Sequence, residues 1–498
     1  MRRIHLHPPR LEGARARFRW SVEPQSELYR RCEFSLRFPE HVPIAGLPER
    51  VWWWVALACL HPHWMLLEPC RVELPVRLGP GERDLWLRLM AAERASLDAH
   101  RGAPLRAPQV EIEEAGPILT PFEPPPERGR CATAFSGGKD SLLQTGLLAE
   151  LCEHPILVAT TSPLPKLQDH LVPRRRRVFR EIVRRREITW VEVESDYRSC
   201  HRNRYPRKQG LPASTNELTD TLLYASALVA AGLALGATHF FVASEAEVQE
   251  SAEREGRIVQ HPHGMYSTAT LRALAAALAP GGIRLGSLTA PLHSWQVQRL
   301  LWTRYVDLAD LQFSCWRARG RQAACNACAQ CLRLAYGVLA AGGRPARMGL
   351  DLARILDSLG GWDPGPGLDD ADLPGPLVKA RLAEQTARLI ATAPLARVED
   401  NLGRCALARR LRPAARRGRR AAAELKRRME ARGPQPLPGF RAGFGRQLDP
   451  LLRQPVETVY SRHFEPEEAR AYAGSLARSE ALAAWLTAPV LCAEGASP

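Results

Sequence analysis

Short apolar segments alternate with helical segments through the middle of this chain, between residues 130 and 345. Because a helix between two strands carries the chain back across the sheet, this alternation predicts parallel strands covered by helices on both faces. We therefore predict an α/β fold with a doubly wound parallel sheet. The expected strands lie at 131–135, 156–160, 190–194, 239–243 and 283–285, and the expected helices at 140–151, 174–186, 218–235 and 270–278.

The regions on either side of residues 130–345 have a different pattern of apolar and polar residues. Residues 17–22 and 32–38 alternate between apolar and polar side chains, as half-buried strands do, and they flank an apolar segment at 51–67. Histidine and proline at 61–63 interrupt that segment, which is too short and too polar to cross a membrane and is interpreted as a buried helix. We predict an N-terminal α+β accessory domain at 1–125, a nucleotide-binding domain at 130–345, and a mostly helical, basic C-terminal region at 346–498.

A glycine-containing loop separates the first expected strand of the middle region from its helix. Its glycines allow backbone N–H groups to turn inward, and the N-terminus of a helix lies behind them, so the loop can bind an anion. It lacks the spacing of a Walker loop. Within it, Lys139 supplies a cation, Asp140 is suited to holding Mg²⁺, and Ser141 supplies a hydroxyl donor; these three are the candidate catalytic residues. The candidate cofactor-binding residues are Ser136, Gly137, Gly138, Lys139, Asp140 and Ser141.

These six residues resemble the signature of the PP-loop, or N-type ATP pyrophosphatase, family. The resemblance implies the adenine nucleotide alpha-hydrolase-like fold and cleavage of ATP, with Mg²⁺, between its α and β phosphates. It further implies that a carboxylate or amide substrate becomes an adenylate while pyrophosphate leaves, and that a nitrogen or sulfur nucleophile then displaces AMP.

Four of the twelve cysteines lie close together, at Cys315, Cys325, Cys328 and Cys331. In a cytosolic protein such a cluster indicates a metal rather than disulfides. Four thiolates at this spacing match a closed, tetrahedral structural Zn²⁺ site. An iron–sulfur cluster, or three ligands with Cys315 incidental, are the alternatives.

The order of the two motifs, together with the Leu288–Leu292 segment ahead of the cysteines, resembles 7-cyano-7-deazaguanine synthases of the queuosine pathway. That resemblance covers roughly residues 130–340. It implies a 7-deazaguanine-type small-molecule substrate, and relatives in anti-phage operons imply a partner protein encoded beside this chain. Three positions depart from the family: Leu211–Asn216 lacks an arginine, Val297 replaces a lysine, and Ser244-Glu245 replaces a longer acidic segment.

Two other functions remain as alternatives. A PP-loop tRNA-modifying enzyme would use the basic C-terminal region to hold RNA, whereas an ATP-binding scaffold would keep the loop without chemistry. The net charge of +16 comes almost entirely from arginine, which suits a GC-rich genome as well as a nucleic-acid partner, so nucleic-acid binding is not favoured. With neither a signal peptide nor a membrane span expected, the predicted location is cytoplasmic. His263 and the basic segment 200–205 are further candidates for an acceptor site, with ordinary loops as the simpler interpretation.

Overall fold

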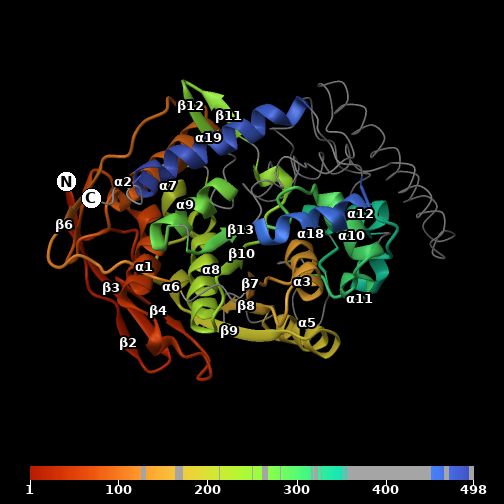
Figure 1. Cartoon of the computed structure of the whole chain (residues 1–498). Helices are drawn as coiled ribbons and strands as arrows, with labels where there is room; N and C mark the ends of the chain where they lie inside the picture. The colour runs from red at the N-terminus through yellow and green to blue at the C-terminus, as the bar shows by residue number, and fades with distance from the viewer. Residues whose placement is uncertain are drawn as a thin grey trace.

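The computed structural model describes residues 1–124, 130–162, 172–355, 450–464 and 470–492, apart from short gaps at 212, 250, 261–266, 281, 314, 316–317, 319–323, 327 and 352–353. Its central feature is an eleven-stranded mixed sheet, which runs through the molecule in Figure 1. The strand order is β13-β10-β7-β8-β9-β4-β3-β1-β5-β6, with β2 paired to β3.

The strands of the middle region form the parallel half of this sheet. Every neighbouring pair among them is parallel, and the chain begins in the centre, adds two strands on one side, and then adds two on the other. This is the order of a Rossmann-like sheet, and it confirms the predicted α/β class. The strands are β7 (Cys131–Ala134), β8 (Ile156–Thr161), β9 (Thr189–Ser195), β10 (His239–Phe241) and β13 (Arg284–Gly286).

Helices cover both faces of the parallel half. Successive side chains of a strand point to opposite faces, and on β8 Ile156 and Val158 join one hydrophobic cluster while Leu157 joins another. The first cluster contains α8 (Thr215–Ala234) and α9 (Thr268–Leu278), and the second contains α3 (Lys139–Leu151), α5 (Val172–Arg185), α10 (Ser294–Thr303) and α12 (Ala329–Ala340). The sheet is therefore doubly wound in this half.

The N-terminal strands extend the same sheet. β4 (Glu33–Arg37) pairs antiparallel with β9, with Leu36 opposite Ser195 and Arg37 opposite Glu194. Because of this junction the predicted parallel sheet is one half of a larger, mixed sheet. The remaining N-terminal elements are β1 (Arg2–Leu6), β2 (Arg10–Glu12), β3 (Arg15–Glu23), β5 (Cys70–Leu74), β6 (Val110–Glu114), α1 (Glu49–Trp64) and α2 (Glu82–His100).

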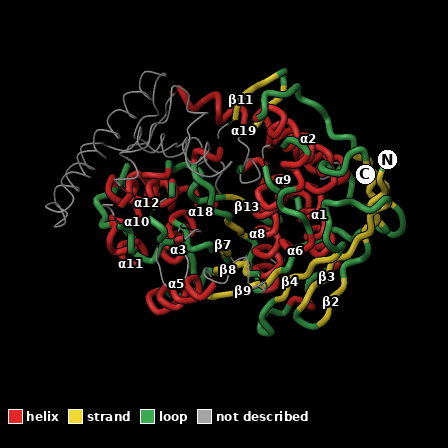
Figure 2. The backbone as a smooth tube through the Cα atoms, turned by 180° about the vertical axis from the view of Figure 1, so that it is seen from behind, coloured by secondary structure: helices red, strands yellow, loops and turns green. Residues whose placement is uncertain are grey.

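The last described helices return to earlier parts of the chain. α19 (Arg470–Cys492) lies along α9 and α2 (Figures 1 and 2), and Arg88 of α2 donates a 3.0 Å hydrogen bond to the carbonyl of Leu486. From α18 (Pro450–Ser461), the Tyr460 hydroxyl donates to the carbonyl of Leu288 at 2.6 Å. The described part of the C-terminal region is thus helical, whereas the arginine-rich run at 404–432 lies outside the described residues.

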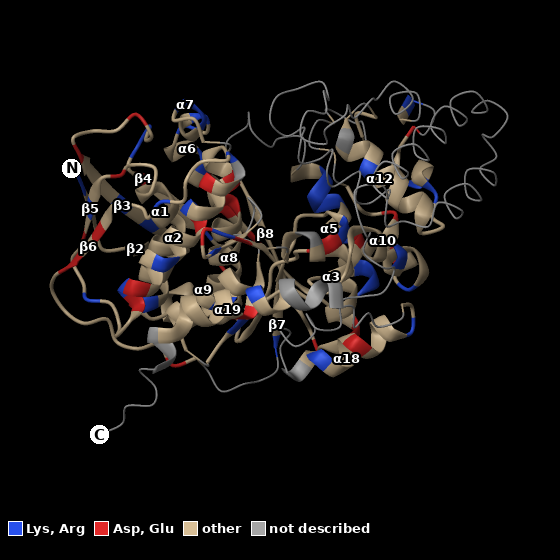
Figure 3. Ribbon diagram, turned by 90° about the horizontal axis from the view of Figure 1, so that it is seen from above, with Lys and Arg blue, Asp and Glu red and all other residues tan. Residues whose placement is uncertain are grey.

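The short elements are α6 (Tyr197–Cys200), α7 (Tyr205–Lys208), α11 (Val306–Ala309), the hairpin β11 (Ser251–Arg254) and β12 (Arg257–Gln260), and the 3-10 turns at Ile44–Gly46, Ala246–Gln249 and Pro345–Met348. Among the described residues, no helix has the length and apolar character needed to span a membrane. Lys and Arg are spread over many elements, with several on α5 (Figure 3).

Three buried histidines lie where α1 meets the middle region. His63 shares hydrogen bonds with the hydroxyls of Tyr29 (3.2 Å) and Tyr197 (3.1 Å), and His201 Nε2 lies 2.9 Å from Asn216 Oδ1. Burial lowers the pKa of His61 and of His201 to about 4, and that of His63 well below 6.5. These residues are therefore neutral at pH 7. His63 and His201 join the two regions through ring packing and neutral hydrogen bonds, whereas His61 packs against Trp86 within the N-terminal region.

We expect acid to destabilise the protein between pH 6.5 and 4. A histidine whose folded pKa is depressed binds its proton more tightly in the unfolded chain, so its contribution to stability is intact above pH 6.5 and is lost as the pH falls toward 4. In that window, each such histidine lowers the free energy of unfolding by about 1.4 kcal/mol for every unit by which the pH falls. The His61→Leu variant, which retains a buried side chain of similar size on α1, should lose stability less steeply in chemical denaturation followed at pH 7, 6 and 5. An unchanged slope would contradict this assignment.

Candidate functional site

The glycine loop lies at the point where the sheet changes direction. β8 lies on one side of β7 and β10 on the other, so the connections that leave these two neighbours diverge and open a crevice beyond the carboxyl ends of the strands. Residues 136–138 leave the carboxyl end of β7 and lead directly into α3. Figure 2 shows β7 between β8 and β13, with α3 beside it. Ligands of open α/β sheets bind at such positions.

Gly137 is required by both its backbone and its surroundings. Its φ is +83°, a conformation that L side chains rarely adopt. A Cβ at this position would also collide with the ring of Phe313. The backbone N–H of Phe313 donates to the carbonyl of Gly137 at 2.9 Å. The loop is thus held from outside by the segment that leads into the cysteine cluster.

The two serines of the loop bond to its own backbone. The N–H of Gly137 donates to Ser141 Oγ at 3.1 Å, and the N–H of Gly138 donates to Ser136 Oγ at 3.3 Å. The two hydroxyls lie 3.2 Å apart. Backbone donors that bond to serine hydroxyls can exchange them for the oxygens of an anion, so this arrangement suits a phosphate-binding loop.

Four charged side chains gather at the end of the loop. Lys139 Nζ lies 2.6 Å from Asp140 Oδ1 and also contacts Glu245, which in turn contacts Arg333. The side chains of Lys139, Glu245 and Arg333 are each less than one-tenth exposed, whereas that of Asp140 is 27% exposed. Burial, followed by the nearby charge of Glu245, raises the pKa of Asp140 to about 6. Two carboxylates here share one ammonium group, and oxygen donors of this kind are those that Mg²⁺ prefers.

Glu245 and Arg333 are site residues that the sequence analysis did not select. Glu245 was noted there only as part of a departure from a family pattern, and Arg333 was not considered. The signal for Glu245 was its place just beyond β10, because carboxyl ends of adjacent parallel strands meet at one edge of the sheet. For Arg333 no comparable signal exists, since only the packing of α12 brings it to this edge.

A pocket of about 150 Å³ adjoins the loop. Arg175 lines it, is 8% exposed, and donates from Nη1 to the carbonyl of Thr160 at 2.8 Å. Tyr224 forms another part of the wall, and its hydroxyl accepts a 2.6 Å hydrogen bond from Arg198, which also pairs with Asp220. The full lining is Ala134, Phe135, Ser136, Ser141, Val158, Thr160, Arg175, Tyr224, Val242 and Ala243.

A larger hollow of about 640 Å³ lies elsewhere, between the N-terminal strands and α5. It is lined by Glu12, Arg37, Arg176, Glu192 and their neighbours, and it includes none of the loop residues. We place the functional site at the smaller pocket because it borders the glycine loop, which the larger hollow does not.

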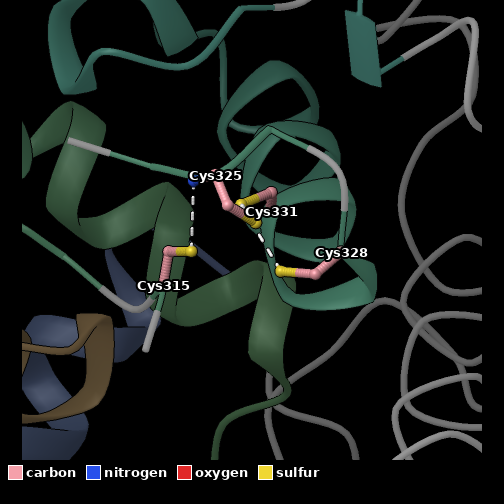
Figure 4. Close-up of side chains that lie close together, drawn as sticks. All are labelled: Cys315, Cys325, Cys328 and Cys331. Carbon is pink, nitrogen blue, oxygen red and sulfur yellow. Dashed lines mark hydrogen bonds between the residues drawn. The ribbon is translucent and has the colours of Figure 1, made fainter. Parts of the chain in front are cut away.

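The structure brings together all four cysteines of the predicted metal site. Their sulfur atoms lie within 4.8 Å of one another, with Cys328 and Cys331 3.6 Å apart and Cys325 and Cys331 3.8 Å apart (Figure 4). Four sulfurs around Zn²⁺, at the usual bond length of about 2.3 Å, would be about 3.8 Å from one another. Hydrogen bonds from the Cys328 and Cys331 thiols lower the pKa of Cys315. The cluster can hold a metal such as zinc, and Cys315 belongs to it.

Two positions that departed from the family pattern are structural here. Ser214 caps α8, in a capping box with Glu217, and the Asn216 side chain contacts His201. Val297 is fully buried on α10 in a hydrophobic cluster. The 261–264 segment that contains His263 lies outside the described residues.

Compared with protein-family models, curated proteins and solved structures, the chain matches none of them.

Proposed function

We propose that this protein is an ATP-dependent enzyme of the PP-loop type, which adenylates a carboxylate or amide and releases pyrophosphate before a nitrogen nucleophile attacks. The main support is the gathering of Lys139, Asp140 and Glu245 around a glycine loop at the direction change of a Rossmann-like sheet. Glycine amides, a buried ammonium and paired carboxylates are together the groups that a magnesium-bound triphosphate requires.

In this proposal the loop residues act by positioning and by neutralising charge. The Gly137 and Gly138 amides turn from the serine hydroxyls to the departing pyrophosphate. Lys139 moves its ammonium from the carboxylates to the phosphate oxygens. Asp140 and Glu245 would hold Mg²⁺, which would supply positive charge next to the phosphates. Acid would oppose this arrangement, because a protonated carboxyl group is a poor metal ligand.

We further propose that the pocket beside the loop takes part of the acceptor, of the 7-deazaguanine class. A buried guanidinium binds carboxylates well, and Arg175 supplies one at the pocket wall. A cavity of this volume accommodates about one aromatic ring, so a whole nucleotide would have to extend beyond it over the loop.

The test is pyrophosphate release from Mg·ATP by zinc-loaded protein, with and without 7-carboxy-7-deazaguanine. We expect the acid to stimulate release, and Asp140→Ala to reduce the stimulated rate at least ~100-fold, as loss of one preorganised charged group does. Asp84→Ala is the matched control, because Asp84 also lies in the first turn of a helix but is exposed and remote from the loop.

The other outcomes separate the alternatives. ATP binding by calorimetry without stimulation would refute the deazaguanine assignment. Release stimulated by total tRNA would then identify a tRNA-modifying enzyme. No release with any acceptor would identify a scaffold. Absence of ATP binding would refute the whole proposal.

A further inference from the structure

Both ends of the cysteine cluster are attached to the glycine loop. Phe313 lies two residues before Cys315, and its backbone N–H bonds to Gly137 while its ring fills the space beside that glycine. Arg333 lies two residues after Cys331 on α12, and its guanidinium contacts Glu245, which contacts Lys139. Two separate connections therefore join the metal-binding segment to the residues that would hold a nucleotide.

The Arg333 connection is well defined. Its Nη2 donates to Ser294 Oγ at 2.8 Å in addition to contacting Glu245, and Arg333, Glu245 and Ser294 are all buried. A buried carboxylate is costly without a cationic partner. If Lys139 turns away to meet a phosphate, Arg333 is the cation that remains beside Glu245.

We propose that metal binding at Cys315, Cys325, Cys328 and Cys331 is thermodynamically coupled to nucleotide binding at the loop, through Arg333 and Phe313. This inference rests on the proposed ATP site. A metal bound to the cysteines fixes the start of α12, so it holds Arg333 against Glu245 and Phe313 against Gly137. Without the metal, Arg333 is held less firmly beside Glu245, so Glu245 attracts the Lys139 ammonium more strongly and leaves it less free to bind phosphate. Arg333 is thus a positioning residue that acts through Glu245.

Coupling between two binding sites is reciprocal. We expect zinc to tighten ATP binding about tenfold, within the usual range for such coupling, and ATP to tighten zinc binding by the same factor. Calorimetry of Mg·ATP with zinc-loaded and chelator-treated protein measures the first factor. Competition with a zinc-binding dye, with and without ATP, measures the second.

The Arg333→Met variant should still bind one zinc per chain. In this variant zinc should change the affinity for ATP less than tenfold, and ATP should change the affinity for zinc by the same smaller factor. Arg347→Met is the matched control: this arginine is exposed in the turn after α12, and its loss should leave both factors unchanged. Equal ATP affinity with and without zinc would overturn the proposal, as would coupling that is undiminished in Arg333→Met.

A nucleotide-free measurement keeps the coupling testable if ATP does not bind. Hydrogen–deuterium exchange of the peptide spanning 136–141 should increase when zinc is removed, and in zinc-loaded Arg333→Met. If exchange of this peptide is the same after zinc removal and in Arg333→Met, the coupling itself is refuted. If exchange increases but ATP does not bind, only the nucleotide assignment is refuted.

Discussion

Replacing Gly137 with alanine should abolish nucleotide binding, with the dissociation constant for Mg·ATP rising at least ~100-fold. Alanine is strained at a φ of +83°, which costs roughly 1–2 kcal/mol. Its Cβ would also collide with the ring of Phe313, an aromatic side chain that is 6% exposed and packed in the core. The loop must therefore shift, and the donors that would meet the phosphates move with it. Calorimetry or a fluorescent ATP analogue measures the loss.

A matched variant separates the two causes. Gly236 has nearly the same φ, +82°, but nothing lies near the position of its Cβ. Gly236→Ala should therefore lose a little stability and bind nucleotide normally. Combining Gly137→Ala with Phe313→Leu removes most of the collision and should restore part of the affinity. If Gly137→Ala alone binds ATP as the wild type does, the loop is not the phosphate site.

Replacing Cys331 with serine should remove the metal and destabilise the protein. Cys331 is 1% exposed and lies within 4 Å of two other cysteine sulfurs, and the serine hydroxyl is a much weaker zinc ligand than a thiolate. Zinc at a thousand times its dissociation constant adds about 4 kcal/mol to the free energy of unfolding. We therefore expect zinc content to fall from one per chain to near zero. Unfolding should become easier by at least ~3 kcal/mol, because binding energy at a structural zinc site is folding energy.

The control for this variant is Cys59→Ser. Cys59 is also fully buried, but it contacts the hydroxyl of Ser226 far along the chain rather than other cysteines. Its replacement should leave the zinc content at one. Elemental analysis and chemical denaturation measure both variants. Iron with a visible absorption band in the wild type would replace the zinc assignment with an iron–sulfur cluster, and a metal-free wild type would refute the metal site.

Local chemistry made part of this protein predictable from its sequence. The alternation of apolar and polar residues between 130 and 345 is a local property, so it indicated the α/β class, the five parallel strands and four of the helices that cover them, but not α10 or α12. The loop at 136–141 is contiguous, and three of the four cysteines lie within seven residues. Residues this close in the sequence are also close in space in any fold. The sequence therefore indicated that the loop lies between β7 and α3, and it selected the four cysteines that the fold brings together.

Long-range pairing decided the rest. The period of β4 shows that it is a strand, but backbone hydrogen bonds are nearly independent of side-chain identity, so nothing local indicates that it pairs with β9 rather than ending a separate sheet. The packing of α19 against α2 and α9 is also a contact between distant parts of the chain, which no local pattern indicates. So is the contact of Glu245 with Lys139 and Arg333, which brings together three residues separated by 106 and 88 positions. The sequence by itself determined which elements form and which motifs they carry; only the tertiary structure decided which charges meet at the loop, because burial and the crossing of helices over the sheet place those side chains together.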